Sequence, residues 1–317
     1  MNKPFLSICI PTFNRSEYLR DCLLSLVKDV SPENREKIEI VITDNSDNER
    51  TQAMVEEFKK MFSRVNYVRN ETNIGSSRNF FKALSLGEGK YLWLMGDDDL
   101  VISSKVDLII EKLGLDDYSA AILNFAQGDS RNPEIVMLDN CLGIKDDRVF
   151  YGRDDLFAGQ DFVNFFALNF MSVLIYSREG FYLVYEEALK FINSCYFQSY
   201  IFLLLAAQDK SIIRICDTCV IWRSLEAPRR YDTWLKDEDD IFNQYFGYIR
   251  YAGKIGFKYD SVYLEESIRF KAINLFYYKK NIWKTKLKKI LARLGIEKPA
   301  LKILDLFRHL KYILKKK

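Results

Sequence analysis

Three consecutive carboxylates follow an apolar run at residues 91–95, in the turn Gly96-Asp97-Asp98-Asp99. Like charges this close repel one another, and a divalent cation placed among them relieves the repulsion. Carboxylate oxygens are also the ligands that Mg²⁺ and Mn²⁺ prefer. The structural alternative is a solvated acidic loop that caps a following helix at Ser103 or Ser104. The position of the turn directly after an apolar run favours the metal site.

Two further polar segments follow apolar runs near the start of the chain. Pro11-Thr12-Phe13-Asn14-Arg15 lacks the glycines of a dinucleotide-binding fingerprint or a P-loop, which argues against a nicotinamide enzyme or a P-loop kinase. In Asp44-Asn45-Ser46-Asp47, the first carboxylate lies where it can accept hydrogen bonds from a nucleotide base or a ribose hydroxyl. The same Asp-Asn-Ser sequence is also typical of an ordinary turn.

A fourth segment, Asn73 to Asn79, is predicted to begin a helix. Small residues such as Gly75 expose backbone N–H groups there, and Arg78 lies one turn inside the helix, so the segment is a candidate diphosphate site. The alternative is a helix start that carries an arginine on its surface.

The elements that must position these segments are predicted from hydrophobic periodicity. Apolar residues at helical spacing separate short runs that are typical of strands, at residues 6–10, 38–42, 65–68, 91–95 and 120–123. This alternation predicts an α/β fold with a mostly parallel central sheet flanked by helices. Ligands of such sheets bind beyond the carboxyl ends of the strands, which is where the polar segments are expected.

The alternation loosens after residue 125. A strand is predicted at 172–176, helices at 181–208 and another strand at 212–215. We therefore expect residues 1–230 to form one domain with two halves, 1–125 and 126–230. The remaining residues, 231–317, are predicted to form a helical C-terminal extension.

Bulk properties bound the class of protein. The chain has 317 residues, of which 48% are hydrophobic, and its first residues are too few and too polar for a secretory signal. The longest strongly apolar run, 201–207, is far shorter than the roughly 18 residues that span a bilayer. Six scattered cysteines favour reduced thiols in the cytoplasm. Cys216 and Cys219 have the spacing of a redox pair or half a zinc site, but no second pair exists, so packing is the favoured interpretation.

The net charge of +3 is unevenly distributed. Residues 279–317 hold fourteen Lys and Arg against two acids, a net of +12, which leaves −9 for the rest of the chain. An acidic body argues against nucleic-acid binding. Basic residues alternate with apolar ones in this tail, which is typical of helices that lie on an anionic membrane. The alternative is that the apolar side packs on the body and the lysines are solvated.

With these segments in hand, the chain resembles the family 2 glycosyltransferases of the GT-A fold, particularly bacterial enzymes that assemble lipopolysaccharide or capsular polysaccharide. The resemblance is strong over residues 5–125 and loose over the next hundred. It implies a nucleotide-sugar-binding half over 1–125 and an acceptor-binding half over 126–230. It also implies inverting transfer from a nucleotide-diphosphate sugar, with Mn²⁺ or Mg²⁺, to a saccharide acceptor that is lipid-linked at the inner face of the cytoplasmic membrane.

Site residues are carried over by position. The resemblance assigns Asp44 to the base, and the donor's nucleotide and diphosphate to the segments that contain Pro11, Thr12, Asn14, Arg15, Asn73, Gly75 and Arg78. Aligned with the family pattern Leu-Asp-x-Asp-Asp, Gly96 replaces the first acid and Asp98 holds the metal. Read instead as D-x-D, the turn gives that role to Asp99. With Asp98 as the metal ligand, Asp97 or Asp99 is assigned a supporting role, through contacts with the sugar or with water.

The general base is unassigned. The family places a Glu-Asp pair at the start of an apolar helix about 90 to 100 residues beyond the acidic turn, and the corresponding helix here begins near Gln198, which cannot act as a base. Glu186 and Glu187 are expected on the surface, and Asp161 is as much a helix cap as a base. Basic residues that could close over the diphosphate follow the last strand, at Trp222-Arg223 and Arg229-Arg230. A catalytically silent sugar-nucleotide or glycan-binding relative remains the alternative.

Overall fold

The structure is a computed structural model, and it describes residues 3–129, 132, 134–156, 167–223, 247, 251, 252 and 254. The chain divides into two compact units, residues 1–258 and 259–317, and every described residue lies in the first. The expected basic helices of the C-terminal extension, 231–317, thus lie almost wholly outside the described residues. Among the helices described, none combines the length and the apolar character needed to cross a membrane.

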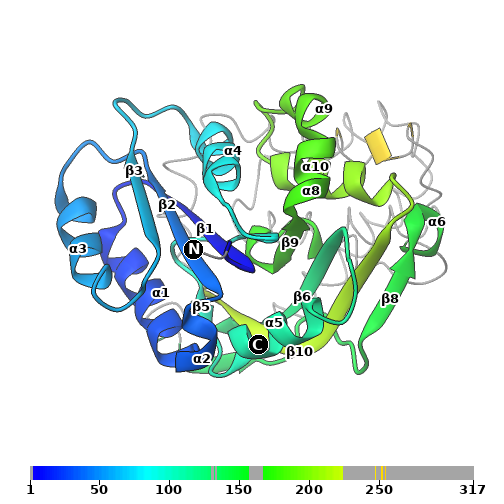
Figure 1. The fold of residues 1–317 in the computed structure, drawn as a ribbon, viewed down its shortest axis with the longest axis horizontal. Helices are drawn as coiled ribbons and strands as arrows, with labels where there is room; N and C mark the ends of the chain where they lie inside the picture. Colours follow the sequence, from blue (N-terminus) through cyan, green and yellow to red (C-terminus); the bar gives the residue numbers. More distant parts are fainter. Residues whose placement is uncertain are drawn as a thin grey trace, which may run out of the picture. The chain divides into compact units, whose positions relative to one another are not determined.

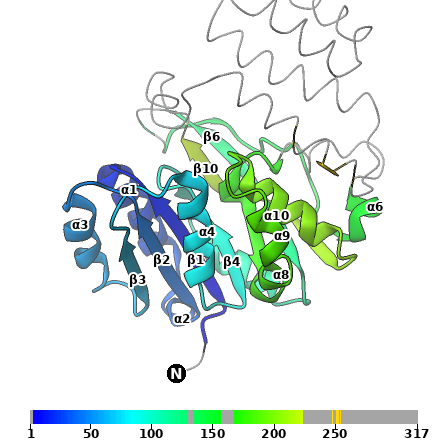
Figure 2. The ribbon, with the colours of Figure 1, turned by 90° about the horizontal axis from the view of Figure 1, so that it is seen from above.

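Within the described residues, ten strands form one sheet. They are β1 (Leu6–Thr12), β2 (Ile38–Asp44), β3 (Val65–Arg69), β4 (Tyr91–Leu94), β5 (Leu100–Val101), β6 (Ala120–Gly128), β7 (Val136–Leu138), β8 (Arg148–Tyr151), β9 (Leu174–Ser177) and β10 (Ser211–Arg223). Their main order is β3-β2-β1-β4-β9-β6-β10-β5, with β7 beside β6 and β8 beside β10. Figure 1 labels these strands except β4 and β7, and Figure 2 labels β4. The predicted strands are all present, and the strand expected at 212–215 extends to Arg223.

The described helices are α1 (Ser16–Asp29), α2 (Pro32–Arg35), α3 (Arg50–Phe58), α4 (Ser76–Leu86), α5 (Lys105–Leu113), α6 (Gly152–Leu156), the 3-10 helix η1 (Met171–Val173), α8 (Arg178–Leu183), α9 (Tyr185–Leu189) and α10 (Phe197–Ala206). The helices that the periodicity predicts in this part of the chain are present, whereas α2, α6 and η1 were not predicted. Both ribbon views place α4 and α8–α10 on one side of the sheet (Figures 1 and 2). Every residue of α10 is buried, so this helix lies in the core.

The α/β class is confirmed, but the sheet is parallel in only part of its width. β1 pairs in parallel with β2 and β4, and β2 with β3, as strand-helix-strand units require. β9 lies between β4 and β6 and runs antiparallel to both. It directly follows the 3-10 helix η1. The sheet is therefore mixed beyond β4.

Burial explains why β1 and β2 read as continuous apolar runs. All seven residues of each strand are buried, because helices cover both faces of a parallel sheet. Polar residues at their ends are buried as well, which requires partners for every side chain. Those ends meet at one edge, where the candidate site lies.

Candidate functional site

The acidic turn lies between β4 and β5 and is held from both sides. β5 follows the turn directly and pairs with the end of β10, at Val220 and Ile221. Asp97 and Asp99 are 5% and 2% exposed, whereas the side chain of Asp98 is 21% exposed. The solvated acidic loop is therefore wrong. Ser104 does precede α5, but its side chain does not cap that helix.

Asp97 binds the residues that follow β1. Thr12 Oγ1 donates a hydrogen bond to Asp97 Oδ2 at 2.7 Å, and Arg15 Nη1 lies 3.3 Å from Asp97 Oδ1. The same Arg15 nitrogen lies 3.0 Å from Asp98 Oδ2. Thr12 and Arg15 after β1 thus contact acids of the turn that follow them by more than 80 residues, as expected for residues of one site.

Asp99 binds residues that come much later in the chain. Ser172 Oγ donates to Asp99 Oδ2 at 2.5 Å and accepts the N–H of Gly96 at 2.9 Å. The backbone N–H of Arg223 donates to Asp99 Oδ1 at 3.2 Å. Ser172 lies in η1 and was not predicted as a site residue, because no local sequence pattern distinguishes this serine.

Burial gives the two inner acids unusual electrostatics. It raises the pKa of Asp97 to about 7, with Arg15 opposing the shift and the charge of Asp98 adding to it. Burial, followed by the charge of Asp98, raises the pKa of Asp99 well above its usual value, against the hydrogen bond from Ser172. Positive charge placed near the turn would favour the ionised form of both acids.

The turn fits a divalent cation at Asp98 and Asp99. A Cβ at Gly96 would meet Asp99 Oδ2 at 2.8 Å and Asp98 Oδ1 at 3.1 Å, so the absence of a side chain at this position lets these two carboxylate oxygens approach the backbone of the turn. No donor among the described residues reaches Asp98 Oδ1. A hard cation that takes one or two carboxylates and fills its other positions from phosphate or water suits this donor set.

Asp44 lies at the end of β2 and is fully buried. Its Oδ1 accepts the N–H of Ser46 and its Oδ2 accepts the hydroxyl of Tyr67, both at 2.8 Å. Burial, followed by the contact with Asp44, raises the pKa of the Tyr67 hydroxyl. Both interpretations of this segment therefore have support: the acid stabilises a turn, and it stands at the strand end where a base would bind.

A network of asparagine side chains joins the strand ends. Asn45 donates to Asn73 Oδ1 at 3.0 Å and to the carbonyl of Gly75 at 3.3 Å. Asn70 donates to Asn45 Oδ1 at 2.8 Å and to Asn79 Oδ1 at 2.9 Å. The network fixes the loop before α4 against β2. Asn45, Asn70 and Asn79 were missed as positioning residues, because the sequence shows their type but not their partners.

The remaining predicted donor-site residues differ in exposure. Pro11 is buried in β1, while Asn14 is exposed in the left-handed conformation (φ 54°) and donates its N–H to Ser46 Oγ at 2.8 Å. Gly75 precedes α4 with φ 85°, a conformation that glycine adopts without strain. Arg78 is exposed, and its guanidinium contacts Asn193 Oδ1 at 3.3 Å instead of the acidic turn.

Gln198 lies in the first turn of α10 and is 4% exposed. Its Oε1 is buried and has no hydrogen-bond partner among the described residues, and the first turn of α10 holds no acid. Glu186 and Glu187 lie in α9, where the first is exposed and the second pairs with Lys190, as a surface position predicts. Asp161 lies outside the described residues.

Arg223 ends β10 next to the acidic turn. Its guanidinium contacts Asp21 Oδ2 at 2.9 Å and lies 5.1 Å from the ring centroid of Tyr18, so it is directed towards α1. Its neighbour Trp222 lies 6.4 Å, between ring centroids, from Phe170. Arg229 and Arg230 lie outside the described residues.

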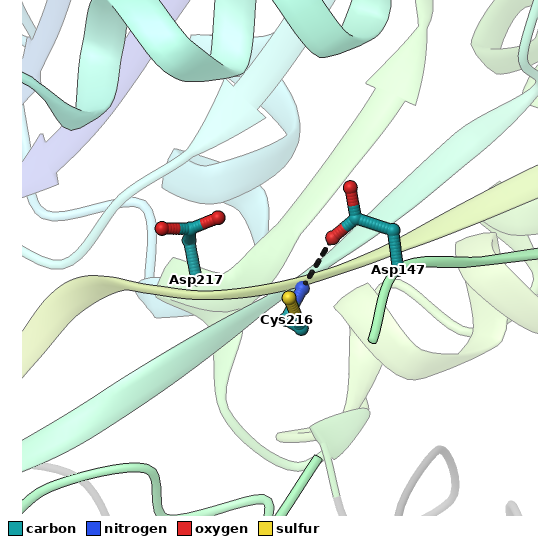
Figure 3. A group of neighbouring side chains, drawn as sticks. All are labelled: Asp147, Cys216 and Asp217. Atoms are coloured by element: carbon teal, nitrogen blue, oxygen red, sulfur yellow. Dashed lines mark hydrogen bonds between the residues drawn. The ribbon is translucent and has the colours of Figure 1, made fainter. Parts of the chain in front are cut away.

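A second group of potential metal ligands lies at Asp147, Cys216 and Asp217, whose ligand atoms come within 4.8 Å of one another (Figure 3). Asp147 accepts the N–H of Cys216 at 2.8 Å and pairs with Lys112 at 2.7 Å, while Asp217 pairs with Lys105 at 2.7 Å. Lysines already neutralise both carboxylates. This agrees with a packing role for the Cys216 to Cys219 segment.

Comparison with curated proteins finds similarity over the first part of the chain. An abequosyltransferase of Salmonella typhimurium is 36% identical over 109 residues, which are 33% of this chain and 31% of that protein. A GalNAc(5)-diNAcBac-PP-undecaprenol β-1,3-glucosyltransferase of Campylobacter jejuni is 26% identical over 110 residues, 34% of each chain. The matched segment thus spans about a third of these relatives.

Solved structures share the fold over a longer range. TarS of S. aureus, residues 1–349, has a TM-score of 0.60 at 14% identity, and the match covers 92% of this chain and 78% of that one. The mannosyltransferase PcManGT of Pyrobaculum calidifontis, in complex with GDP-Man and Mn²⁺, has a TM-score of 0.56 at 15% identity, covering 94% and 82%. These likenesses show the GT-A fold.

The sequence model of one protein family matches this chain across both halves of the sheet. It matches residues 7–175, more than half of the chain, from β1 through the acidic turn to β9. The match includes Thr12, Arg15, the three acids and Ser172, which the fold brings together. The chain therefore belongs to glycosyl transferase family 2.

Proposed function

We propose that this chain is an inverting glycosyltransferase, which moves a sugar from a nucleotide-diphosphate donor to a saccharide acceptor with a divalent cation, Mn²⁺ or Mg²⁺. The observation that carries the proposal is the acidic turn, which lies at the end of β4 with its inner acids bound to Thr12, Arg15 and Ser172. The names of the relatives, all sugar transferases in the cases given above, support it.

The donor would lie along the ends of β1 to β4. Ligands bind at this edge of α/β sheets, and the helix N-terminus at α4 offers backbone N–H groups to a diphosphate. We assign donor binding to the segments after the strands, with these residues: Pro11, Thr12, Asn14, Arg15, Asp44, Asn73, Gly75, Arg78 and Asp97.

The cation would be held by Asp98, with Asp99 as its second ligand. Asp98 is the more exposed of the two and has an oxygen that no described donor reaches, whereas both oxygens of Asp99 are engaged. When bound, the cation supplies positive charge beside the departing nucleoside diphosphate. The protein's own part is to hold one oxygen of each carboxylate close to the backbone at Gly96.

Inversion requires the acceptor hydroxyl to attack the anomeric carbon from the face opposite the diphosphate. The bond from that carbon to the phosphate oxygen breaks, a bond to the acceptor oxygen forms, and the hydroxyl proton passes to a base. Gln198 lies at the helix start where the family carries an acid, and its amide can orient the hydroxyl but not take the proton. The base is not among the residues assigned here.

We further propose that the acceptor is lipid-linked and that the enzyme acts in cell-surface polysaccharide synthesis, on the inner face of the cytoplasmic membrane. The undecaprenol in the name of the Campylobacter relative supports a lipid-linked acceptor. The charge of +12 over residues 279–317 supports attachment to anionic lipid. In this proposal residues 1–230 are the catalytic domain, with donor and acceptor halves, and 231–317 the membrane-binding extension.

A thermal-shift screen tests the proposal. UDP-, GDP- and CDP-sugars are each added with and without Mn²⁺, and a donor present at about 100 times its Kd should stabilise the protein by about 2.7 kcal/mol. In Asp98→Asn the part of the shift that depends on Mn²⁺ should disappear. Asp116→Asn, at an exposed acid outside the site, is the matched control. No shift with any nucleotide sugar would contradict the proposal.

The buried amide of Gln198 favours one alternative, a relative that binds the donor or a glycan without catalysis. Chromatography of the released nucleotide separates the two. Slow hydrolysis of the bound donor that needs Mn²⁺ and Asp98 indicates an enzyme. Binding without any hydrolysis or transfer indicates the silent relative.

A further inference from the structure

We infer that Arg15 is a built-in counter-ion, which neutralises Asp98 through its other carboxylate oxygen in the absence of the cation, until a diphosphate draws it away. This inference rests on the function proposed above. It concerns how the free protein keeps three adjacent acids stable, and it predicts that metal and nucleotide bind cooperatively.

The contacts of Arg15 single it out. Its Nη1 bridges Asp97 Oδ1 and Asp98 Oδ2, at 3.3 and 3.0 Å, and its side chain is 17% exposed. Arg223 contributes only its backbone N–H to the turn, since its guanidinium binds Asp21. Among the described residues, Arg15 therefore supplies the positive side chain that contacts the acids.

The position of Arg15 in its own helix does not explain these contacts. It is the N-cap of α1, where Ser, Thr, Asp or Asn usually accepts a backbone hydrogen bond, and its side chain makes no such bond. A positive side chain is also unfavourable at the positive end of a helix. The attraction to Asp97 and Asp98 compensates for a residue that is poorly suited to begin a helix.

The guanidinium of Arg15 and a divalent metal ion compete for the negative charge of Asp98. A divalent ion that binds Asp98 Oδ1 meets a carboxylate whose other oxygen already binds Arg15. A diphosphate offers the guanidinium a partner with two parallel oxygens, which is among the strongest hydrogen-bonding arrangements of arginine. Once Arg15 has moved to the diphosphate, the cation binds Asp98 without competition. By linkage, the cation then strengthens nucleotide binding by the same factor.

The test measures Mn²⁺ affinity of the full chain by isothermal titration calorimetry, with no nucleotide present. Arg15→Gln should bind Mn²⁺ about fivefold tighter or more than the wild type, the range in which such couplings usually fall. Arg15→Lys keeps the charge and should stay near the wild-type affinity. Arg20→Gln is the matched control, because Arg20 lies on the same helix but pairs with Glu57 on the surface.

A second titration adds a saturating nucleoside diphosphate, with UDP, GDP and CDP each used as the probe. The nucleotide should tighten Mn²⁺ binding in the wild type and do so by a smaller factor in Arg15→Gln. If the wild type binds Mn²⁺ and a folded Arg15→Gln protein binds it no more tightly than the wild type does, the inference about Arg15 is wrong. The proposed function is not affected by that result. Failure of both proteins to bind Mn²⁺ with any of the three nucleotides overturns the proposed metal, and the inference with it.

Discussion

Ser172 stabilises two parts of the acidic turn at once. Its hydroxyl donates to Asp99 and accepts the N–H of Gly96, and its carbonyl accepts the indole N–H of Trp93 at 2.8 Å. The side chain is fully buried, so water does not replace these bonds when they are lost. Ser172 is thus a positioning residue for Asp99.

Replacing Ser172 tests that role. Ser172→Ala leaves a buried carboxylate and a buried N–H without their partner, which should lower the free energy of unfolding by about 1–3 kcal/mol. Urea unfolding measures the loss. Ser103→Ala, at an exposed serine, should change it by less than about 0.5 kcal/mol. A Ser172→Ala protein as stable as the control would show that the hydroxyl does not hold the turn.

At the scale of elements, β10 connects the acidic turn to the loop that contains Asp147. One end of β10 reaches Asp99 through Arg223, and Cys216 in its middle binds Asp147. Partial burial alone would raise the pKa of Asp147, but hydrogen bonds from Lys112 and from the N–H of Cys216 lower it. The ionised carboxylate therefore stabilises the folded state.

The sign of this shift predicts a pH dependence. A folded-state pKa below the usual value of about 3.9 stabilises the protein above that pH, and the effect is lost as the pH falls through the folded-state pKa. Asp147→Asn should be less stable than the wild type at neutral pH, with the difference shrinking below about pH 4. Urea unfolding across pH measures it, with the exposed Asp154→Asn as control. A difference that stays constant down to about pH 3 would contradict the assignment.

The elements themselves could be predicted from the sequence to different degrees. β1 and β2 are continuous apolar runs because both faces are covered, and that signal is local. β5 has two residues and was missed, because it exists only through its pairing with β10. The antiparallel direction of β9 was missed for a similar reason, since it depends on neighbours far away in the chain.

The same distinction separates the site residues that could be predicted from those that could not. The three acids stand together in the sequence at a strand end, so their location was predictable. The contact of Arg15 with them spans 82 residues, and that of Ser172 with Asp99 spans 73. Such pairs follow only from the way β1, β4 and β9 lie side by side.

At the scale of the whole molecule, charge is divided between an acidic body and a basic tail. The tail lies outside the described residues, and its proposed membrane role follows from the sequence alone. Each lysine near an anionic surface contributes about 1 kcal/mol to binding. Neutralising several of them should therefore weaken attachment steeply.

Sedimentation with anionic phospholipid vesicles measures this attachment. Four tail lysines are replaced by Gln: Lys288, Lys289, Lys315 and Lys316. At about 1 kcal/mol for each, the substitutions should weaken binding by roughly a thousandfold. The matched control replaces four exposed lysines of the body by Gln: Lys28, Lys37, Lys59 and Lys60. This variant should bind the vesicles as the wild type does. Deleting the chain after residue 280 should release the protein. Unchanged sedimentation of the tail variants would count against a membrane role.

The close packing around Gly96 also limits how this turn can diverge among natural sequences. A Cβ there would lie 2.8 Å from Asp99 Oδ2 and 3.3 Å from Ser172 Oγ. A relative with aspartate at this position, as in the pattern Leu-Asp-x-Asp-Asp, must move the last acid or carry a different neighbour at position 172. Positions 96 and 172, which are 76 residues apart, are thus expected to covary, so that a single substitution at either is selected against unless the other changes.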